Sequence, residues 1–172
     1  MFKLSMLFLV GASLAICCAA QQTGNSQTLE VDDGTQTKAT KPESKYNAEL
    51  AEELGADEYG MKAYVFVLLK TGKVIIEEKE ESQKVFAGHF ANMSRLAEAG
   101  KLVLAGPFID GEPKRGLFIL NVATIAEAEA LVKTDPAVAA GVFDYELTKL
   151  YSSAALMKIG EIHETVQKTK ID

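Results

Sequence analysis

The chain has 172 residues, of which 48% are hydrophobic and 24% are charged, and its formal net charge is −6 at pH 7. This length accommodates one globular domain with a sizeable core and leaves little room for a second large domain. The acidic balance and the lack of a long Lys/Arg block exclude the electrostatic footprint of a general nucleic-acid binder. No nucleic acid is therefore expected among the partners.

The first part of the chain predicts an export signal. Residues 1–20 contain one early lysine, an apolar run of the length of a signal-peptide hydrophobic region, and then small residues. Cleavage after Ala20 would give a secreted protein, whereas lipid attachment at Cys17 or Cys18 would give a periplasmic or outer-membrane lipoprotein with a lipid anchor in the membrane. Both routes stay open, and the long polar segment that follows favours the lipoprotein. Since the chain has no other cysteine, no disulfide is expected in the mature domain.

Composition divides the rest of the chain into three parts. Residues 21–60 are predicted to be a flexible linker, because most of this segment is too polar to bury much surface. A short helix is expected near its end, with Asn47 as the N-cap and Gly55 as the stop. An α+β domain is predicted over 61–152, and a C-terminal helical extension over 153–172.

Within the domain, the apolar patterns predict the element order βαββαβ. The expected elements are a strand at 62–71, a helix at 83–99 capped by Ser82, strands at 101–106 and 117–122, a helix with a capping box of Thr124 and Glu127, a strand at 142–153 and a final helix from 154. The acidic run at 77–82 is expected to be a solvated stretch before the first of these helices. This order predicts a ferredoxin-like sheet with both helices on one face.

The central strands predict a homodimer. In residues 64–69 and 117–120 the side chains of both parities are apolar, so both faces of the sheet should be buried. The two helices cover one face. A second copy of the same sheet would cover the other, which gives a dimeric α+β barrel.

His89 lies among apolar residues of the predicted helix, inside an arc of about 140°. A buried imidazole without a hydrogen-bond partner would cost roughly 1–3 kcal/mol, so the fold should supply one. The partner is either a backbone carbonyl, which makes His89 a packed core residue, or a carboxylate, which makes it an acid–base group. Asp135, aimed by the turn at Pro136, is the first candidate carboxylate, and Asp110 is the second. A His–Asp pair would hold the ring in one tautomer, as general base chemistry requires.

A few other residues are weaker candidates for ligand binding. Gly106 and Pro107 either let a ligand approach the backbone or form an ordinary turn, and Arg115 either binds a substrate carboxylate or is a solvated loop charge. Arg95 is expected on the surface, opposite the apolar arc, and His163 at the border of a packed helix without a function. No Cys/His/Asp/Glu spacing indicates a metal site, and no phosphate- or dinucleotide-binding motif is present.

The run "HFANMSRLAEAGKLVLAGPF", followed by "GLFIL" and "EAEALVKTDPAVAAGVF", resembles the YCII-related family of dimeric α+β barrel proteins over residues 62–151. The resemblance places the family's helix histidine at His89 and the aspartate of its Asp-Pro step at Asp135, a pair proposed to form the active site. It implies an isomerase or lyase step on a small organic molecule, without a cofactor. The alternative is a non-catalytic dimeric domain that binds a small ligand or a protein partner.

Overall fold

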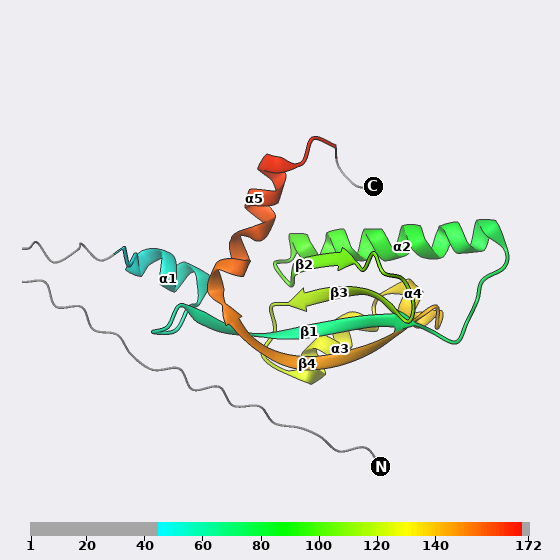
Figure 1. Ribbon diagram of the computed structural model, residues 1–172, viewed down its shortest axis with the longest axis horizontal. Helices are drawn as coiled ribbons and strands as arrows, with labels where there is room; N and C mark the ends of the chain where they lie inside the picture. The colour runs from blue at the N-terminus through cyan, green and yellow to red at the C-terminus, as the bar shows by residue number, and fades with distance from the viewer. Residues whose placement is uncertain (1–44, 170–172) are drawn as a thin grey trace, which may run out of the picture. The chain divides into compact units, whose positions relative to one another are not determined.

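The computed structural model describes residues 45–169, so the export signal, Cys17, Cys18 and the first part of the linker lie outside the described residues. Figure 1 shows a twisted sheet with helices packed beside it. In chain order the elements are α1 (Ala48–Leu54), β1 (Met61–Thr71), α2 (Lys79–Glu98), β2 (Leu102–Pro107), β3 (Lys114–Leu120), α3 (Ile125–Val132), α4 (Pro136–Ala139), β4 (Phe143–Ser153), the 3-10 helix η1 (Ala154–Lys158) and α5 (Ile159–Val166).

The four strands form one antiparallel sheet in the order β2-β3-β1-β4. Val67, near the middle of β1, lies opposite Phe118 of β3 on one side and Leu147 of β4 on the other. The two central strands are therefore β1 and β3, which are separated in sequence by α2 and β2. This arrangement is the ferredoxin-like α+β fold, and it confirms the fold predicted from the sequence.

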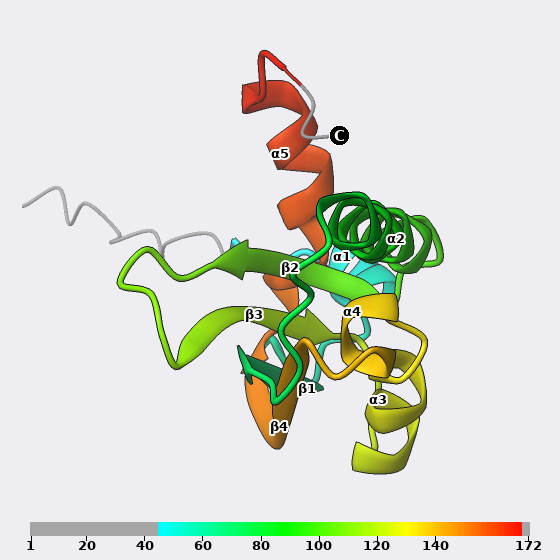
Figure 2. The same ribbon diagram turned by 90° about the vertical axis from the view of Figure 1, so that its right-hand side faces the viewer.

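One face of the sheet carries the core. Helices α2, α3 and α4 all lie on this side of the sheet (Figure 2). Alternate side chains of β1 and β3 point into the layer between sheet and helices and are almost fully buried: Val65, Val67, Leu69, Phe118 and Leu120. Each such side chain contributes roughly 1.5–3 kcal/mol by burial, so this layer fixes where α2 can sit.

The opposite face of the sheet is covered only in part. Tyr64 is buried there, and its hydroxyl donates a hydrogen bond of 3.2 Å to the carbonyl oxygen of Ser153, which directly precedes η1. Phe66, Leu68 and Leu117 on the same face are half-buried. Residues of the same chain thus cover one end of this face, which was predicted from the sequence to be covered by a second copy of the sheet. A dimer across the remaining part stays a prediction.

The start of α2 differs from the prediction. The helix begins at Lys79, and the N-cap is Glu78, whose carboxylate accepts hydrogen bonds from the backbone N–H groups of Glu80 and Glu81. These bonds favour the charged form and hold the pKa of Glu78 below its usual value. Ser82, the predicted cap, lies inside the helix. Much of the acidic run therefore forms the first turn, where negative charge is stabilised by the helix dipole.

Other helix ends agree with the prediction. Asn47 caps α1 by accepting from the N–H of Leu50, and Gly55 ends the helix in the left-handed conformation at φ 67°. Thr124 and Glu127 form the predicted capping box of α3. The predicted final helix is divided into the 3-10 helix η1 and helix α5.

Candidate active site

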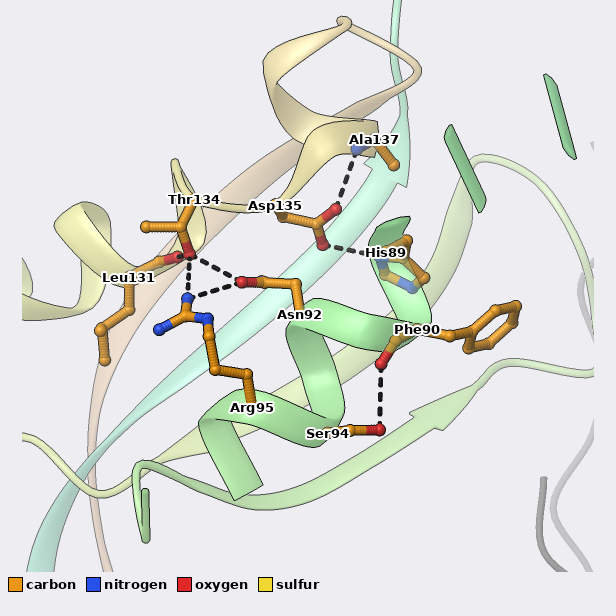
Figure 3. A network of polar contacts seen from close by, with 9 residues as sticks. All are labelled: His89, Phe90, Asn92, Ser94, Arg95, Leu131, Thr134, Asp135 and Ala137. Atoms are coloured by element: carbon orange, nitrogen blue, oxygen red, sulfur yellow. Dashed lines mark hydrogen bonds and ion pairs between the residues drawn. The ribbon is translucent and has the colours of Figure 1, made fainter. Parts of the chain in front are cut away.

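A short contact joins α2 to the turn between α3 and α4. His89 Nδ1 lies 2.6 Å from Asp135 Oδ2, and the two side chains are 9% and 1% exposed (Figure 3). The second carboxylate oxygen, Oδ1, accepts the N–H of Ala137 at 2.9 Å. We assign an ionised carboxylate, which can only accept, and place the shared proton on Nδ1, because Oδ1 already accepts from the N–H of Ala137. In the neutral imidazole, the other ring nitrogen, Nε2, then carries the lone pair.

The local sequence explains why Asp135 is held so firmly. It is the N-cap of α4, and Pro136 occupies the first turn of that helix, where its missing N–H costs nothing. Gly88, the residue before His89, lets α2 approach this turn closely. A Cβ at Gly88 would lie 2.9 Å from Cγ of Pro136, so a larger residue would push the two segments apart.

Aromatic rings surround the imidazole of His89. The ring centroids of Phe143, Phe90, Phe118 and Phe86 lie 5.3, 5.4, 6.1 and 6.5 Å from that of His89, and Phe118 is the one that stacks on it. Such apolar surroundings lower the local dielectric constant and so strengthen the electrostatic part of a hydrogen bond. The contact between His89 and Asp135 is therefore strong for reasons of both distance and environment.

A cavity of about 470 Å³ opens against this ring, a size typical of small-ligand pockets. Its walls are mainly apolar, and the lining includes Leu69, Phe86, Phe90, Met93, Phe118 and Phe143 along with His89. The structure brings three further sequence candidates to the same cavity: Gly106, Pro107 and Arg115. Asp110 lies in the exposed β2–β3 loop and is not part of this lining.

The polar groups of the cavity lining differ in their exposure and in their hydrogen bonds. Arg115 is 40% exposed, and its guanidinium lies 3.2 Å from the carboxylate of Glu112, so it stands at a solvated edge of the cavity. A Cβ added to Gly106 would meet no atom within 4 Å, so the backbone is open to contact there. The hydroxyl of Ser94 donates to the carbonyl oxygen of Phe90, one turn earlier in α2.

A polar network that the sequence did not predict lies beside the His–Asp pair. Arg95 is exposed, as expected, but its guanidinium donates to Asn92 Oδ1 at 2.6 Å and to Thr134 Oγ1 at 2.9 Å (Figure 3). Asn92 is buried at 8% exposure. Its position three residues after His89 places it on the same side of α2, and this spacing was the signal that could have found it.

The second histidine has a different environment. His163 lies in α5 and is exposed. Within residues 45–169, no three His, Cys, Asp or Glu side chains lie close enough together to hold a metal ion. In the same part of the chain, no helix is both long and apolar enough to cross a membrane.

The fold and this site define a ferredoxin-like α+β domain with a buried His–Asp pair at an apolar cavity. The model of the YCII-related domain matches residues 63–150, just over half of the chain, and the protein belongs to that family. Among solved structures, the chain is similar to the 5-chloro-2-hydroxyhydroquinone dehydrochlorinase of Burkholderia phenoliruptrix AC1100, in complex with 2,5-dihydroxybenzoquinone. The identity is 17% and the TM-score 0.38, over 49% of this chain and 90% of that chain. A search of curated proteins found no match.

Proposed function

We propose that this domain catalyses proton transfer on a small organic molecule, in an isomerase or lyase type of reaction, with His89 as the acid–base group. One observation carries the proposal: the ring of His89 is bonded to buried Asp135 at 2.6 Å and lines an apolar cavity of about 470 Å³. A general base needs a fixed tautomer and access to substrate. Asp135 supplies the first, and the cavity supplies the second.

In the proposed step, Nε2 of His89 takes a proton from a carbon next to a carbonyl carbon of the substrate, or from the corresponding carbon in the keto tautomer of a phenol. The electron pair of the broken C–H bond moves into an enolate. The enolate then either accepts the proton back from His89 at another carbon, which is isomerisation, or expels a leaving group from the adjacent carbon with its bonding electron pair, which is elimination. In the second case the imidazolium releases its proton to the leaving group or to water. Asp135 remains ionised and stabilises the imidazolium that forms.

The cavity walls determine what could bind. Phe118 and Phe143 present apolar surface to a flat ring, and the open backbone at Gly106 leaves space for its edge. Arg115, at the solvated edge, is the group we assign to an anionic substituent such as a carboxylate or phenolate. These features favour a small cyclic molecule with one negative charge.

Deuterium exchange tests this proposal. Small cyclic ketones, phenols and quinols with an acidic substituent would be incubated with the full-length protein in D2O, and loss of C–H signal would be followed by NMR. We expect a compound whose C–H exchanges with wild type, and His89→Gln should slow that exchange by about 10²–10⁴-fold. His163→Gln is the matched control and should exchange at the wild-type rate. Exchange unaffected by His89→Gln would contradict the proposal.

The same screen distinguishes the alternative function. A compound that shifts resonances of residues lining the cavity, yet shows no exchange and no conversion, would indicate a non-catalytic domain that binds small ligands. In that case His89 would be a bonded wall residue rather than an acid–base group.

We also propose that the domain forms a homodimer through the partly covered face of the sheet. Half-buried Phe66, Leu68 and Leu117 support this, because a second copy would remove them from water. Sedimentation velocity should give a dimer for wild type, a monomer for Leu68→Lys and a dimer for the control Ala91→Lys on the exposed side of α2. A monomeric wild type would refute the dimer.

For the N-terminal part we propose export through residues 1–20, with a lipid on Cys17 or Cys18. Metabolic labelling with a fatty acid should mark the wild-type protein. The label should be absent when both cysteines are replaced by alanine. An unlabelled wild type recovered in the culture medium would favour simple secretion.

A further inference from the structure

Three residues form a bridge between α2 and the turn that carries Asp135. Arg95 and Asn92 come from the helix, and Thr134 directly precedes Asp135 in the turn (Figure 3). We propose that Arg95 is a positioning residue, which acts through Asn92 and Thr134 to hold Asp135 at hydrogen-bonding distance from His89. The consequence for catalysis rests on the proposed function, whereas the positioning itself does not.

The geometry of α2 directs these residues to one place. His89, Asn92 and Arg95 follow one another at intervals of three, so they form an oblique strip that winds from the apolar side of the helix toward its exposed side. The consecutive residues Thr134 and Asp135 of the turn face this strip, with Arg95 and Asn92 bonded to the first and His89 to the second. The turn is therefore attached to the helix at two neighbouring points.

Because of Arg95, this attachment does not depend on which acceptor the hydroxyl of Thr134 donates to. The hydroxyl of Thr134 has one proton and two acceptors in reach, the carbonyl of Leu131 at 2.6 Å and Asn92 Oδ1 at 3.0 Å. If the proton goes to Leu131, the direct bond between Thr134 and Asn92 is lost. The guanidinium of Arg95 still donates to both side chains. Bonds from a charged donor are also the stronger ones.

A packing contact on the other side of the pair completes the support. Gly88 precedes His89, Pro136 follows Asp135, and these two residues touch so closely that no Cβ fits between them. Packing at Gly88 and Pro136 limits how near the turn can come. The bridge through Arg95 limits how far it can tilt away. Without the bridge, the turn can pivot about Pro136, and the 2.6 Å contact of Asp135 lengthens.

The Nδ1 proton of His89 reports this directly, because its exchange with water depends on how often the bond to Asp135 opens. The experiment records the ring proton by NMR in the full-length protein and measures its exchange with solvent. We expect about tenfold faster exchange in Arg95→Met than in wild type. Arg95→Lys, which keeps a charged donor, should recover part of the difference. Lys84→Met removes a positive charge from an exposed site of the same helix that has no bond to another side chain within residues 45–169, and should leave the exchange unchanged.

Two results would overturn the inference. One is an exchange rate in Arg95→Met equal to that of Lys84→Met. The other is equal acceleration of the backbone amides throughout the domain, which would indicate a loss of global stability only. If Arg95→Met does not fold, Thr134→Val removes a single hydroxyl from the bridge and should give a smaller acceleration at the same proton. No substrate is needed, so a protein without enzymatic activity would disprove the proposed function and leave this result intact.

Discussion

The two sides of α2 have opposite characters. On one side His89, Asn92 and Arg95 are bonded to the turn that carries Asp135, and none of the polar bonds depends on a ligand. On the other side Phe90 and Met93 line the cavity, and Phe90 remains 42% exposed. One side fixes the imidazole and the other leaves space in front of it. A histidine at the junction is thereby both rigid and accessible, which is what acid–base chemistry requires.

The largest effect is expected on the bonded side. Asp135→Ala removes the partner of His89 Nδ1 and the cap of α4, and leaves a buried donor unpaired. We expect the free energy of unfolding to fall by about 3 kcal/mol in a denaturant titration. Asp110→Ala, at an exposed loop position, is the control and should change stability by less than about 0.5 kcal/mol. Equal effects of the two substitutions would mean that the pair contributes nothing to the fold.

A smaller effect is expected where the two segments touch. In Gly88→Ala, the added methyl would clash with the ring of Pro136, which costs about 1–3 kcal/mol, and the better helix propensity of alanine returns up to about 1 kcal/mol. We expect a net loss of about 1 kcal/mol. In Gly160→Ala of α5, the added Cβ meets no atom within 4 Å. This variant therefore gains helix propensity without a clash and should be more stable than wild type. Stabilisation in both variants would show that the approach of α2 to Pro136 is loose.

A substitution on the cavity side of α2 should weaken ligand binding more than it weakens the fold. Phe90→Ala removes a half-exposed ring, so we expect a loss of stability below about 1 kcal/mol. It also removes part of the cavity wall, and the affinity for any ring compound found in the screen should fall, as measured by a chemical-shift titration. If Phe90→Ala destabilised the protein as much as Asp135→Ala does, the contrast between the two sides of α2 would not hold.

The smallest effect concerns the N-terminal end of α2. Because the pKa of Glu78 is lowered in the folded protein, its cap stabilises the fold above the pKa of the unfolded chain and loses this contribution as the pH falls through the folded value. Thermal unfolding of wild type and Glu78→Gln should therefore differ more at pH 7 than at pH 3. A difference that does not change with pH would indicate that the carboxylate charge is unimportant for the cap.

Local patterns predicted the individual strands and most helix ends because each depends on nearby residues. The capping box of Thr124 and Glu127 is an example. The predicted start of α2 was wrong. Ser82 is a favourable N-cap by residue type, whereas the actual N-cap is Glu78 with its longer side-chain carboxylate.

For the site, the turn at Pro136 suggested Asp135 as the partner of His89, and the structure places them in contact. The spacing of three residues from His89 could have placed Asn92 on the same side of α2, but the bonds that join Asn92 to Thr134 could not be predicted in this way. They arise from contacts between segments 42 residues apart, and periodicity does not show which side of a helix meets a distant turn. The catalytic role of the pair itself stays a prediction.

The central claim is that Asp135 holds His89 in the tautomer that leaves Nε2 free at the cavity. A long-range ¹H–¹⁵N spectrum of the ring, recorded for the neutral imidazole, tests it directly. We predict a protonated Nδ1 and an unprotonated Nε2, and a mixture of tautomers in Asp135→Asn. A wild-type ring that carries its proton on Nε2, or that shows the same mixture as the variant, would contradict the account.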